Sequence, residues 1–527
     1  MASDWPDATR YARGGLVCTV DHLASSAGIA VLRAGGSAAD AAVAASAVLA
    51  VTTQHMCGAG GDLLAVVHPG RGRGEARALL AVGRAGSGSD PDRLRGEGHT
   101  RMPFRDDVRT VTAPGCVDGW LALHSAYGRL PFAQVLAPAI GYATDGFPVS
   151  PLLATAMPVV AGVRGGEDFH VPAVVGTLLR RPRLADALTA IGTEGREAWY
   201  GGAFGRGLVA VGQGVFTEAD LARDQAEWTE PASLAVGDGH VLSTPTPTAG
   251  YLVLAGAKVA HQVGALAAAA DDPHLLVEAV RVTGHDRPAR LADGVPWQVL
   301  LDPADLDARA ARIRPDRALD LRVPVEGGGT IYLCAADGDG MTVSLSQSNA
   351  AGFGAHLAVP EVGVFLHNRG IGFSLQPGHP AELGPGRRPT HTLCPSMLLG
   401  PDGAPTAIGT MGGDAQPQVL LQLMAALGTG ATPAAALGRP RWVVTGPRSD
   451  GFDAWEPWPD GSVAPAVALE HAAPPEWEEA LLARGHRVTR ADRGRGFGHA
   501  HLARTTGDGM LAGASDPRAG TGDAQAF

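Results

Sequence analysis

Apolar residues recur at helical spacing near the start of the chain and at strand spacing shortly afterwards. Residues 21–51 are rich in alanine, and their pattern is interrupted only by Gly35-Gly36. This predicts a helix, a turn and a second, buried helix. LLAVVH and ALLAVG then flank the turn-rich stretch PGRGRGEAR and predict two strands. Residues 86–111 show no regular period and are expected to be irregular.

The middle of the chain has a mainly helical pattern. Residues 130–235 alternate helical stretches with Gly/Pro breaks. Residues 236–254 predict a strand pair with a Pro-rich turn, which leads into a helix near residues 252–270. Residues 302–322 are highly charged, and we expect them to form a mobile loop.

The pattern changes at residues 326–330, which is the sharpest internal boundary. TIYLCAAD and MTVSLSQS follow, separated by DGDG, and an Asp-Gly turn between two such runs predicts a β-hairpin. Further short strands are expected within SMLLGPDGAPTAIGT and near VALE and ARTT, with a helix at QVLLQLMAALG. We find no repeat of fixed period.

Composition and charge favour a globular protein that acts on a small molecule or peptide. The chain has 527 residues, of which 45% are apolar, so it can bury a large core. A net charge of −11 without any run of Lys or Arg argues against nucleic acid or anionic lipid as the partner. No run of about 18 uncharged apolar residues predicts a membrane span. The five cysteines are widely spaced and lack CxxC pairs, which predicts reduced thiols in a cytoplasmic protein.

Three consecutive glycines stand directly before Thr330, in VEGGGTIYLCAADGDG. One interpretation is a loose loop that leads into the hairpin. The other is self-cleavage of the Gly329–Thr330 bond by the Thr330 hydroxyl, which leaves Thr330 with a free α-amine that can act as its own base. Glycine suits that step, because it tolerates the backbone conformations that expose and strain a peptide bond. The local pattern alone favours the plain loop.

Nine stretches spread over residues 20–518 favour the second interpretation. In this order, they resemble the γ-glutamyltranspeptidase family of N-terminal nucleophile hydrolases: DHLASSAGIAVLRAGGSAADAAVAA, QHMCGAGGD, VTAPGCVDGW, YGRLPFAQVLAPAIGYATDGFPVS, TEADLARDQAEW, GGGTIYLCAADGDGMTVSLSQS, RRPTHTLCPSM, GTMGGD and GASDPR. The resemblance implies an α+β fold, a four-layer αββα sandwich. It also implies a large segment, residues 1–329, and a small segment, residues 330–527, that together build one catalytic domain as a heterodimer after self-cleavage.

The resemblance also assigns roles to individual residues. Thr330 falls on the nucleophile of the family, and Gly412 and Gly413 fall on the glycine pair whose N–H groups stabilise the oxyanion. Ser348 is the best match for the second hydroxyl, which orients the nucleophile. Asn349 stands beside it as a candidate substrate ligand. Arg84 matches the arginine that receives the substrate carboxylate, a task that suits a guanidinium because it pairs with both carboxylate oxygens.

Several positions depart from the pattern of the glutathione-cleaving members. Arg369 and Gly372 stand where a polar and an acidic residue would hold the α-ammonium of a γ-glutamyl group. An arginine there would repel an ammonium and attract a second carboxylate or a carbonyl. His391-Thr392 replace a serine pair, and they are further candidates for substrate binding. The pattern looks more like the branch that includes oxamate amidohydrolase-type and other transpeptidase-like proteins, so we expect a small amide that bears a carboxylate and lacks an α-amine.

Two other kinds of site are disfavoured. His367, His379 and His391 lie in separate loops without HxxxH spacing, so no metal is expected. GAGG at residues 58–61 follows a predicted helix and lacks the GxGxxG order, so no dinucleotide is expected. No cofactor is predicted.

Two alternative functions remain open at the level of the sequence. The first is a true γ-glutamyl transferase or glutathione hydrolase. The second is an unprocessed, non-catalytic relative that acts as a binding protein, because Ile331-Tyr332 replace the usual Thr-His after the nucleophile.

Overall fold

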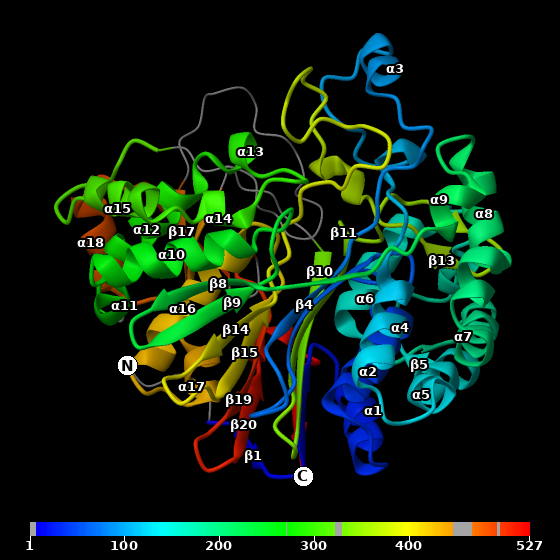
Figure 1. Cartoon of the computed structure of the whole chain (residues 1–527), viewed down its shortest axis with the longest axis horizontal. Coiled ribbons are helices and arrows are strands. Elements are labelled where there is room, and N and C mark those ends of the chain that lie inside the picture. The colour runs from blue at the N-terminus through cyan, green and yellow to red at the C-terminus, as the bar shows by residue number, and fades with distance from the viewer. Residues whose placement is uncertain (1–6, 270, 322–328, 446–465, 493–495) are drawn as a thin grey trace.

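Two seven-stranded sheets stacked face to face form the centre of the molecule (Figure 1). The computed structural model describes residues 7–269, 271–321, 329–445, 466–492 and 496–527. The first sheet has the strand order β1 (Arg10–Ala12), β20 (Leu511–Ser515), β19 (Ala500–Thr505), β15 (Pro405–Thr410), β14 (Ser396–Leu399), β9 (Gly239–Ser243), β8 (Ala232–Val236). The second has the order β21 (Asp523–Ala526), β2 (Gly15–Thr19), β10 (Gly329–Asp337), β11 (Thr342–Ala350), β3 (Asp62–His68), β4 (Arg77–Ala81), β7 (Glu227–Thr229).

Helices cover the outer face of each sheet (Figure 1). The second sheet is covered by α1 (His22–Arg33), α2 (Ala38–Thr52), α4 (Cys116–Tyr127) and α5 (Phe132–Asp145), with α6 (Pro151–Ala156), α7 (Pro182–Glu194), α8 (Ala203–Gly212) and α9 (Glu218–Ala222) further out. The first sheet is covered by α10 (Gly250–Gln262), α11 (Ala265–Ala268), α12 (His274–Gly284), α15 (Pro303–Arg312), α16 (Ala415–Gly428) and α17 (Pro433–Gly438). The order of layers is therefore αββα, as predicted.

Smaller elements complete the chain. They comprise the helices α3 (Pro91–Gly96), α13 (Arg287–Arg290), α14 (Trp297–Leu300) and α18 (Pro475–Ala483), the strand pairs β5 (Phe147–Pro148) with β6 (Leu178–Leu179) and β12 (Ala358–Val359) with β13 (Val364–Phe365), and a three-stranded sheet of β16 (Trp442–Thr445), β17 (Ala466–Glu470) and β18 (Val488–Ala491). No helix among the described residues is long and apolar enough to cross a membrane.

The strand β10 packs against a different layer on each of its faces. Ile331 and Leu333 belong to the core that the second sheet shares with its helices, whereas Tyr332 and Cys334 belong to the core between the two sheets. Successive side chains of a strand point to opposite faces, so Thr330 shares the inter-sheet face with Tyr332. Burial on both faces explains why residues 331–336 of this strand form a continuous apolar run without alternation.

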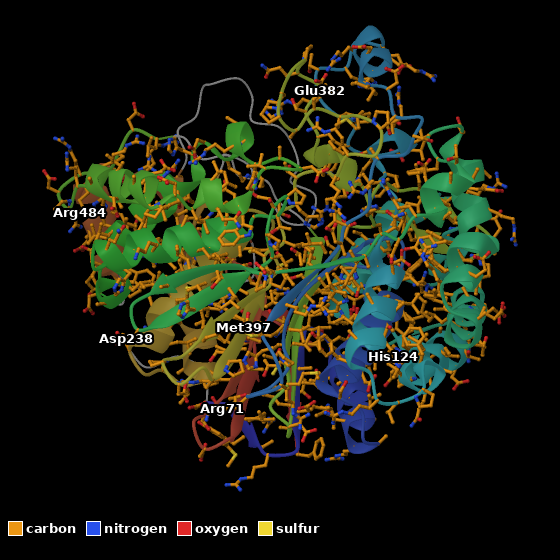
Figure 2. The ribbon with its side chains drawn as sticks, in the orientation of Figure 1. Arg71, His124, Asp238, Glu382, Met397 and Arg484 are labelled. Atoms are coloured by element: carbon orange, nitrogen blue, oxygen red, sulfur yellow. The ribbon has the colours of Figure 1, made fainter. Side chains whose placement is uncertain are left out.

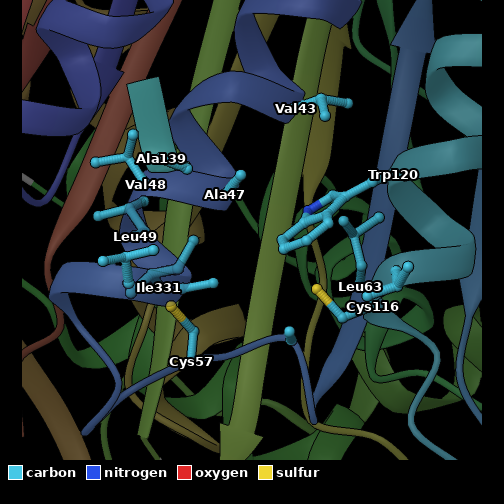
Figure 3. Close-up of a cluster of buried hydrophobic side chains, with 14 of the residues drawn as sticks. Val43, Ala47, Val48, Leu49, Cys57, Leu63, Cys116, Trp120, Ala139 and Ile331 are labelled. Carbon is cyan, nitrogen blue, oxygen red and sulfur yellow. The ribbon is translucent and has the colours of Figure 1, made fainter. Parts of the chain in front are cut away.

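The helix α2 is buried along its whole length, which its small side chains permit (Figure 3). Leu49 of this helix lies close to Ile331 of β10, and Val43, Ala47 and Val48 belong to the same core (Figure 3). In the other core, Met397 lies near the middle of the molecule, far from the peripheral side chains of Glu382 and Arg484 (Figure 2). The strand that begins at the candidate nucleophile is thus enclosed from both sides.

Most of the elements predicted from the sequence are present. The two N-terminal helices, the strands β3 and β4, the hairpin of β10 and β11, and the later strands and α16 all lie where the pattern placed them. The hairpin pairs Thr330 with Ser348 and Tyr332 with Ser346. The glycines Gly327 and Gly328, upstream of the predicted cleavage site, lie outside the described residues.

Three predictions were wrong. Residues 86–111 are not irregular throughout, because α3 forms within them, and the Asp90 side chain caps that helix by accepting from the N–H groups of Asp92 and Arg93.

The stretch 302–322 is not a loop throughout, because α15 forms within it. The Asp302 side chain caps that helix by accepting from the N–H of Asp305. Leu306 and Arg309 of this helix are buried, and the Arg309 guanidinium pairs with Asp286 and Asp305. The strand pair near residue 236 is β8 with β9, which turns at Gly237-Asp238. The Pro-rich segment follows the pair, and YLVL belongs to α10.

The carboxylate of Asp337 joins the hairpin to the start of α2. Its Oδ2 accepts from the backbone N–H of Ala38 at 2.9 Å, and its Oδ1 accepts from those of Asp339 and Met341 at 3.0 Å. The turn that follows the nucleophile strand is therefore tied to the buried helix.

We predict that Asp337→Ala lowers the free energy of unfolding by about 2–4 kcal/mol, because three backbone donors lose a charged acceptor in a buried site. Urea denaturation measures this loss. Asp339→Ala is the matched control: this neighbouring carboxylate is 45% exposed, and we expect its loss to cost less than about 1 kcal/mol. Equal losses for the two variants would contradict the linking role of Asp337.

Candidate active site

Thr330 lies at the start of β10, buried between the two sheets. Its Oγ lies 3.1 Å from Ser348 Oγ on the neighbouring strand β11. The register of the two strands shifts between Gly329 and Thr330, so that Gly329 is opposite Ala350 and Thr330 is opposite Ser348. Ala350 has φ 69°, a left-handed conformation that is unfavourable for alanine. The backbone is thus irregular at the bond expected to break.

Ser348 connects the two sides of that bond. Its Oγ donates to the carbonyl oxygen of Gly329 at 2.7 Å and lies near the hydroxyl of Thr330. It accepts from the backbone N–H of Ala350 at 2.8 Å and from Nη2 of Arg369 at 2.9 Å. The predicted second hydroxyl is therefore in contact with the predicted nucleophile.

The carboxylate of Asp62 lies behind this serine. Asp62 begins β3 and is the register partner of Ser348. Its Oδ2 contacts Nε of Arg369, Nδ1 of His367 and Nε2 of His391, each at 3.1 Å. We call these four residues, Asp62, His367, Arg369 and His391, the Asp62 cluster, and all of them are buried.

The charges of the Asp62 cluster depend on one another. Burial raises the pKa of the Asp62 carboxyl, but the charge and hydrogen bond of His367 and the hydrogen bond of His391 outweigh it and hold that pKa well below its usual range. Burial, assisted by the positive charge of Arg369, lowers the pKa of His391 to about 4. Nδ1 of His391 accepts from the N–H of Leu393, so the proton of the neutral ring lies on Nε2, which donates to Asp62.

Three members of the Asp62 cluster were candidates for other roles in the sequence analysis, and the fourth, Asp62, was not a candidate. Arg369 and His391 were expected to bind substrate, and His367 was weighed only as a metal ligand. Among the described residues, no group of His, Cys, Asp or Glu is arranged to hold a metal. Asp62 was missed, although it closes the glycine-rich QHMCGAGGD and is the one charged residue before a wholly apolar strand.

The other candidate residues, Asn349, Thr392, Gly412 and Gly413, lie outside the Asp62 cluster. Asn349 donates from its side-chain amide to the carbonyl of Gln54 at 3.0 Å, and Thr392 is buried beside His391. Gly412 and Gly413 lie between β15 and α16 with φ 128° and 55°. These conformations favour glycine, so the pair is suited to a turn in which backbone N–H groups are exposed. The roles of all four residues stay predictions.

Arg84 lies in a cluster of charges of both signs. Its Nη1 donates to the carbonyl of Gly386 at 3.1 Å and lies 3.8 Å from the carboxylate of Asp293, and its side chain is 26% exposed. Burial and the neighbouring charge of Arg388 lower the pKa of Arg84. Arg388 belongs to the RRPTHT motif but was not singled out from the sequence. Two close guanidinium groups form a setting that can accept an anion.

The architecture defines the class of protein. A four-layer αββα sandwich in which a threonine begins a central strand is the fold of the N-terminal nucleophile hydrolases. The match of residues 24–526 to the family model described as gamma-glutamyltranspeptidase is more specific, and the chain belongs to that family. The resemblance noted in the sequence is thereby confirmed.

Individual relatives agree with this assignment. The chain is 32% identical to the oxamate amidohydrolase proenzyme of Klebsiella pneumoniae over 530 residues, which cover 96% of this chain and 97% of the relative. It is 30% identical to the acylase ACY 1 proenzyme of a Pseudomonas species, over 96% and 92% of the two chains. The crystal structure of cephalosporin acylase from Bacillus halodurans superposes with a TM-score of 0.86 at 30% identity, covering 100% of this chain and 98% of that one.

The low pKa of His391 predicts a loss of stability in acid. In the folded state its pKa is about 4, whereas an unfolded histidine has a pKa of about 6.5. As the pH falls from about 6.5 to about 4, the unfolded chain takes up a proton that the folded chain does not. Stability is therefore retained above this window and decreases within it, by about 1.4 kcal/mol per pH unit for this residue.

Urea denaturation at several pH values tests this prediction with His391→Gln, whose amide can still donate to Asp62 but does not titrate. We expect the slope of unfolding free energy against pH in this window to become shallower by the equivalent of about one proton. An unchanged slope would show that His391 does not stay neutral in the folded protein.

Proposed function

We propose that the protein is an amidohydrolase that cleaves its own Gly329–Thr330 bond and then uses Thr330 as an N-terminal nucleophile on the amide of a small, carboxylate-bearing substrate. The observation that carries this proposal is the placement of Ser348 Oγ within hydrogen-bond distance of both the Thr330 hydroxyl and the Gly329 carbonyl. The names of the relatives as proenzymes support a self-processed chain.

The proposed chemistry after self-cleavage needs groups of this chain and, to resolve the acyl-enzyme, water or an acceptor amine. The new α-amine of Thr330, with an ordinary pKa of about 7.7–8.0, takes the hydroxyl proton as Oγ attacks the substrate carbonyl. N–H groups of Gly412 and Gly413 stabilise the oxyanion. The amine then protonates the leaving nitrogen, and water or an acceptor amine resolves the acyl-enzyme. The segments 1–329 and 330–527 remain together as a heterodimer in this proposal.

The charges favour a short acyl group that carries a carboxylate and lacks an α-amine. Arg84 is 26% exposed and its nearest carboxylate, that of Asp293, lies 3.8 Å away, so its charge suits a substrate carboxylate better than that of the adjacent Arg388, which already pairs with Glu227 at 2.7 Å. Arg369 is a weaker candidate for that role than the sequence suggested, because Asp62 already pairs with its charge. Thr392, Asn349 and His391 complete the proposed walls of the acyl site. The name of the Klebsiella relative, an oxamate amidohydrolase proenzyme, fits such a substrate.

The free, buried thiols support a cytoplasmic location, because reduced cysteines are the rule in that compartment. They are Cys18, Cys57, Cys116, Cys334 and Cys394.

We predict that self-cleavage depends on the hydroxyl of residue 330. Intact mass measurement under denaturing conditions should show two fragments, residues 1–329 and 330–527, for the wild type, and a single chain near 53.8 kDa for Thr330→Ala. Thr330→Ser keeps the hydroxyl and should still be cleaved, and Thr155→Ala, a change at an exposed threonine of α6, should be cleaved like the wild type. A wild type that stays intact would instead favour a non-catalytic binding protein.

We predict that the carboxylate of the substrate is recognised through Arg84. With oxamate as the probe, Arg84→Gln should raise KM about tenfold to a hundredfold with a smaller change in kcat, because a charged hydrogen-bond partner is lost. Ethyl oxamate, which lacks the negative charge, should be a poor substrate of the wild type, and its kcat/KM should not change in Arg84→Gln. γ-Glutamyl-p-nitroanilide should react slowly, and rapid turnover of it would favour a true γ-glutamyl transferase.

A further inference from the structure

Ser348 Oγ has four polar neighbours, one more than a hydroxyl can satisfy. They are the Gly329 carbonyl, the Ala350 N–H, Nη2 of Arg369 and the Thr330 hydroxyl, at 2.7, 2.8, 2.9 and 3.1 Å. A serine hydroxyl has one proton to donate and two lone pairs that accept. The chemical nature of the neighbours therefore decides where the proton points.

Three of these neighbours have fixed roles. The backbone N–H of Ala350 and the guanidinium of Arg369 can only donate, so they occupy both lone pairs of the serine oxygen. The carbonyl of Gly329 can only accept, and it is the closest of the four. The serine proton is left to the carbonyl, and no lone pair remains to accept the proton of Thr330.

The arginine is held in this position by Asp62. Nε of Arg369 donates to Asp62 Oδ2 while Nη2 donates to Ser348 Oγ, so the two donors lie on the same side of one rigid, planar group. Asp62 and Ser348 face each other across paired strands, which sets the distance that the guanidinium spans. A cation that contacts the serine oxygen also strengthens the hydrogen bond that the serine donates.

We infer that Arg369, oriented by Asp62, is a positioning residue for self-cleavage: it directs the proton of Ser348 onto the carbonyl of the Gly329–Thr330 bond. This inference rests on the proposed self-cleavage and assigns Arg369 a role in maturation of the chain. Ser348 then stabilises the negative charge on the Gly329 oxygen during cleavage and does not serve as the base for Thr330.

The step balances within the chain and one water molecule. Thr330 Oγ forms a bond to the Gly329 carbonyl carbon, and the oxygen of that carbonyl becomes an oxyanion that accepts from Ser348. The C–N bond then breaks, and the proton of the Thr330 hydroxyl ends on the nitrogen of Thr330. Water hydrolyses the resulting ester, which releases the Gly329 carboxylate and restores the Thr330 hydroxyl.

A double-mutant cycle on the rate of self-cleavage tests the inference. The full-length chains of wild type, Ser348→Ala, Arg369→Met and the double variant are purified early, and the fraction cleaved is followed by intact mass. Loss of Ser348 should slow cleavage about 100-fold to 1,000-fold, as for other oxyanion donors. Arg369→Met should slow it at least about tenfold in the wild-type background, but less than about twofold when Ser348 is already absent.

Two further variants keep the test decisive. If Ser348→Ala is too slow to time, Ser348→Cys replaces it in the cycle, since a thiol is a weaker donor. If Arg369→Met does not fold, Arg369→Lys is used instead, because it keeps the charge beside Asp62 but loses the planar fork of the guanidinium. This variant should fold, and its self-cleavage should be at least severalfold slower than that of the wild type. Arg71→Met, at an arginine that is 70% exposed, is the control and should process like the wild type.

If Arg369→Met slowed self-cleavage by the same factor with and without the Ser348 hydroxyl, the inference would be overturned, and Arg369 would have a purely structural role. Cleavage of Arg369→Met at the wild-type rate would overturn it as well. In either case the wild type would still be cleaved, so this result differs from failure of the proposed function, in which no cleavage occurs.

Discussion

The shared carboxylate oxygen of Asp62 is the interaction on which the geometry around Thr330 depends. It joins the start of β3 to the loop that carries His367 and Arg369 and to the segment that carries His391. A buried charge must be paired, and removal of one partner from a buried ion pair typically costs about 3–5 kcal/mol. The loop with His367 and Arg369 and the segment with His391 are therefore both fixed to the start of β3 and to each other.

The sandwich places this polar group at the end of an otherwise dry interface. Between the sheets, Tyr332 and Cys334 of β10 pack against apolar residues of the first sheet, and the Tyr332 hydroxyl meets Ser344 at 2.9 Å. Ser344, Ser346 and Ser348 alternate along β11 on this same face. The polar positions thus lie where water is excluded, and exclusion of water strengthens each hydrogen bond near Thr330.

The parts of the structure that depend on short-range pattern were predictable from the sequence. The hairpin after Thr330 follows from two strand-like runs around an Asp-Gly turn. The family resemblance named Ser348 as the best match for the second hydroxyl but did not fix the register of the two strands. The helix α15 was missed because its many charged residues outnumber a narrow apolar stripe. The hairpin near residue 236 was misplaced because the Pro-rich segment that follows it is a stronger turn signal than Gly237-Asp238. Asp62 could not be found in this way, since its partners lie 305, 307 and 329 residues away along the chain.

Each sheet contains strands from both sides of the Gly329–Thr330 bond, so neither sheet can be completed before the end of the chain is made. β10 pairs with β2, and β2 in turn pairs with β21, which holds residues 523–526. A nascent chain that has only just passed Thr330 lacks this edge of the sheet and most of the first sheet. A chain that ends before β21 leaves Leu16–Thr19 of β2 without their strand partner, so the sheet that carries Thr330 is complete only once residues 523–526 have been added.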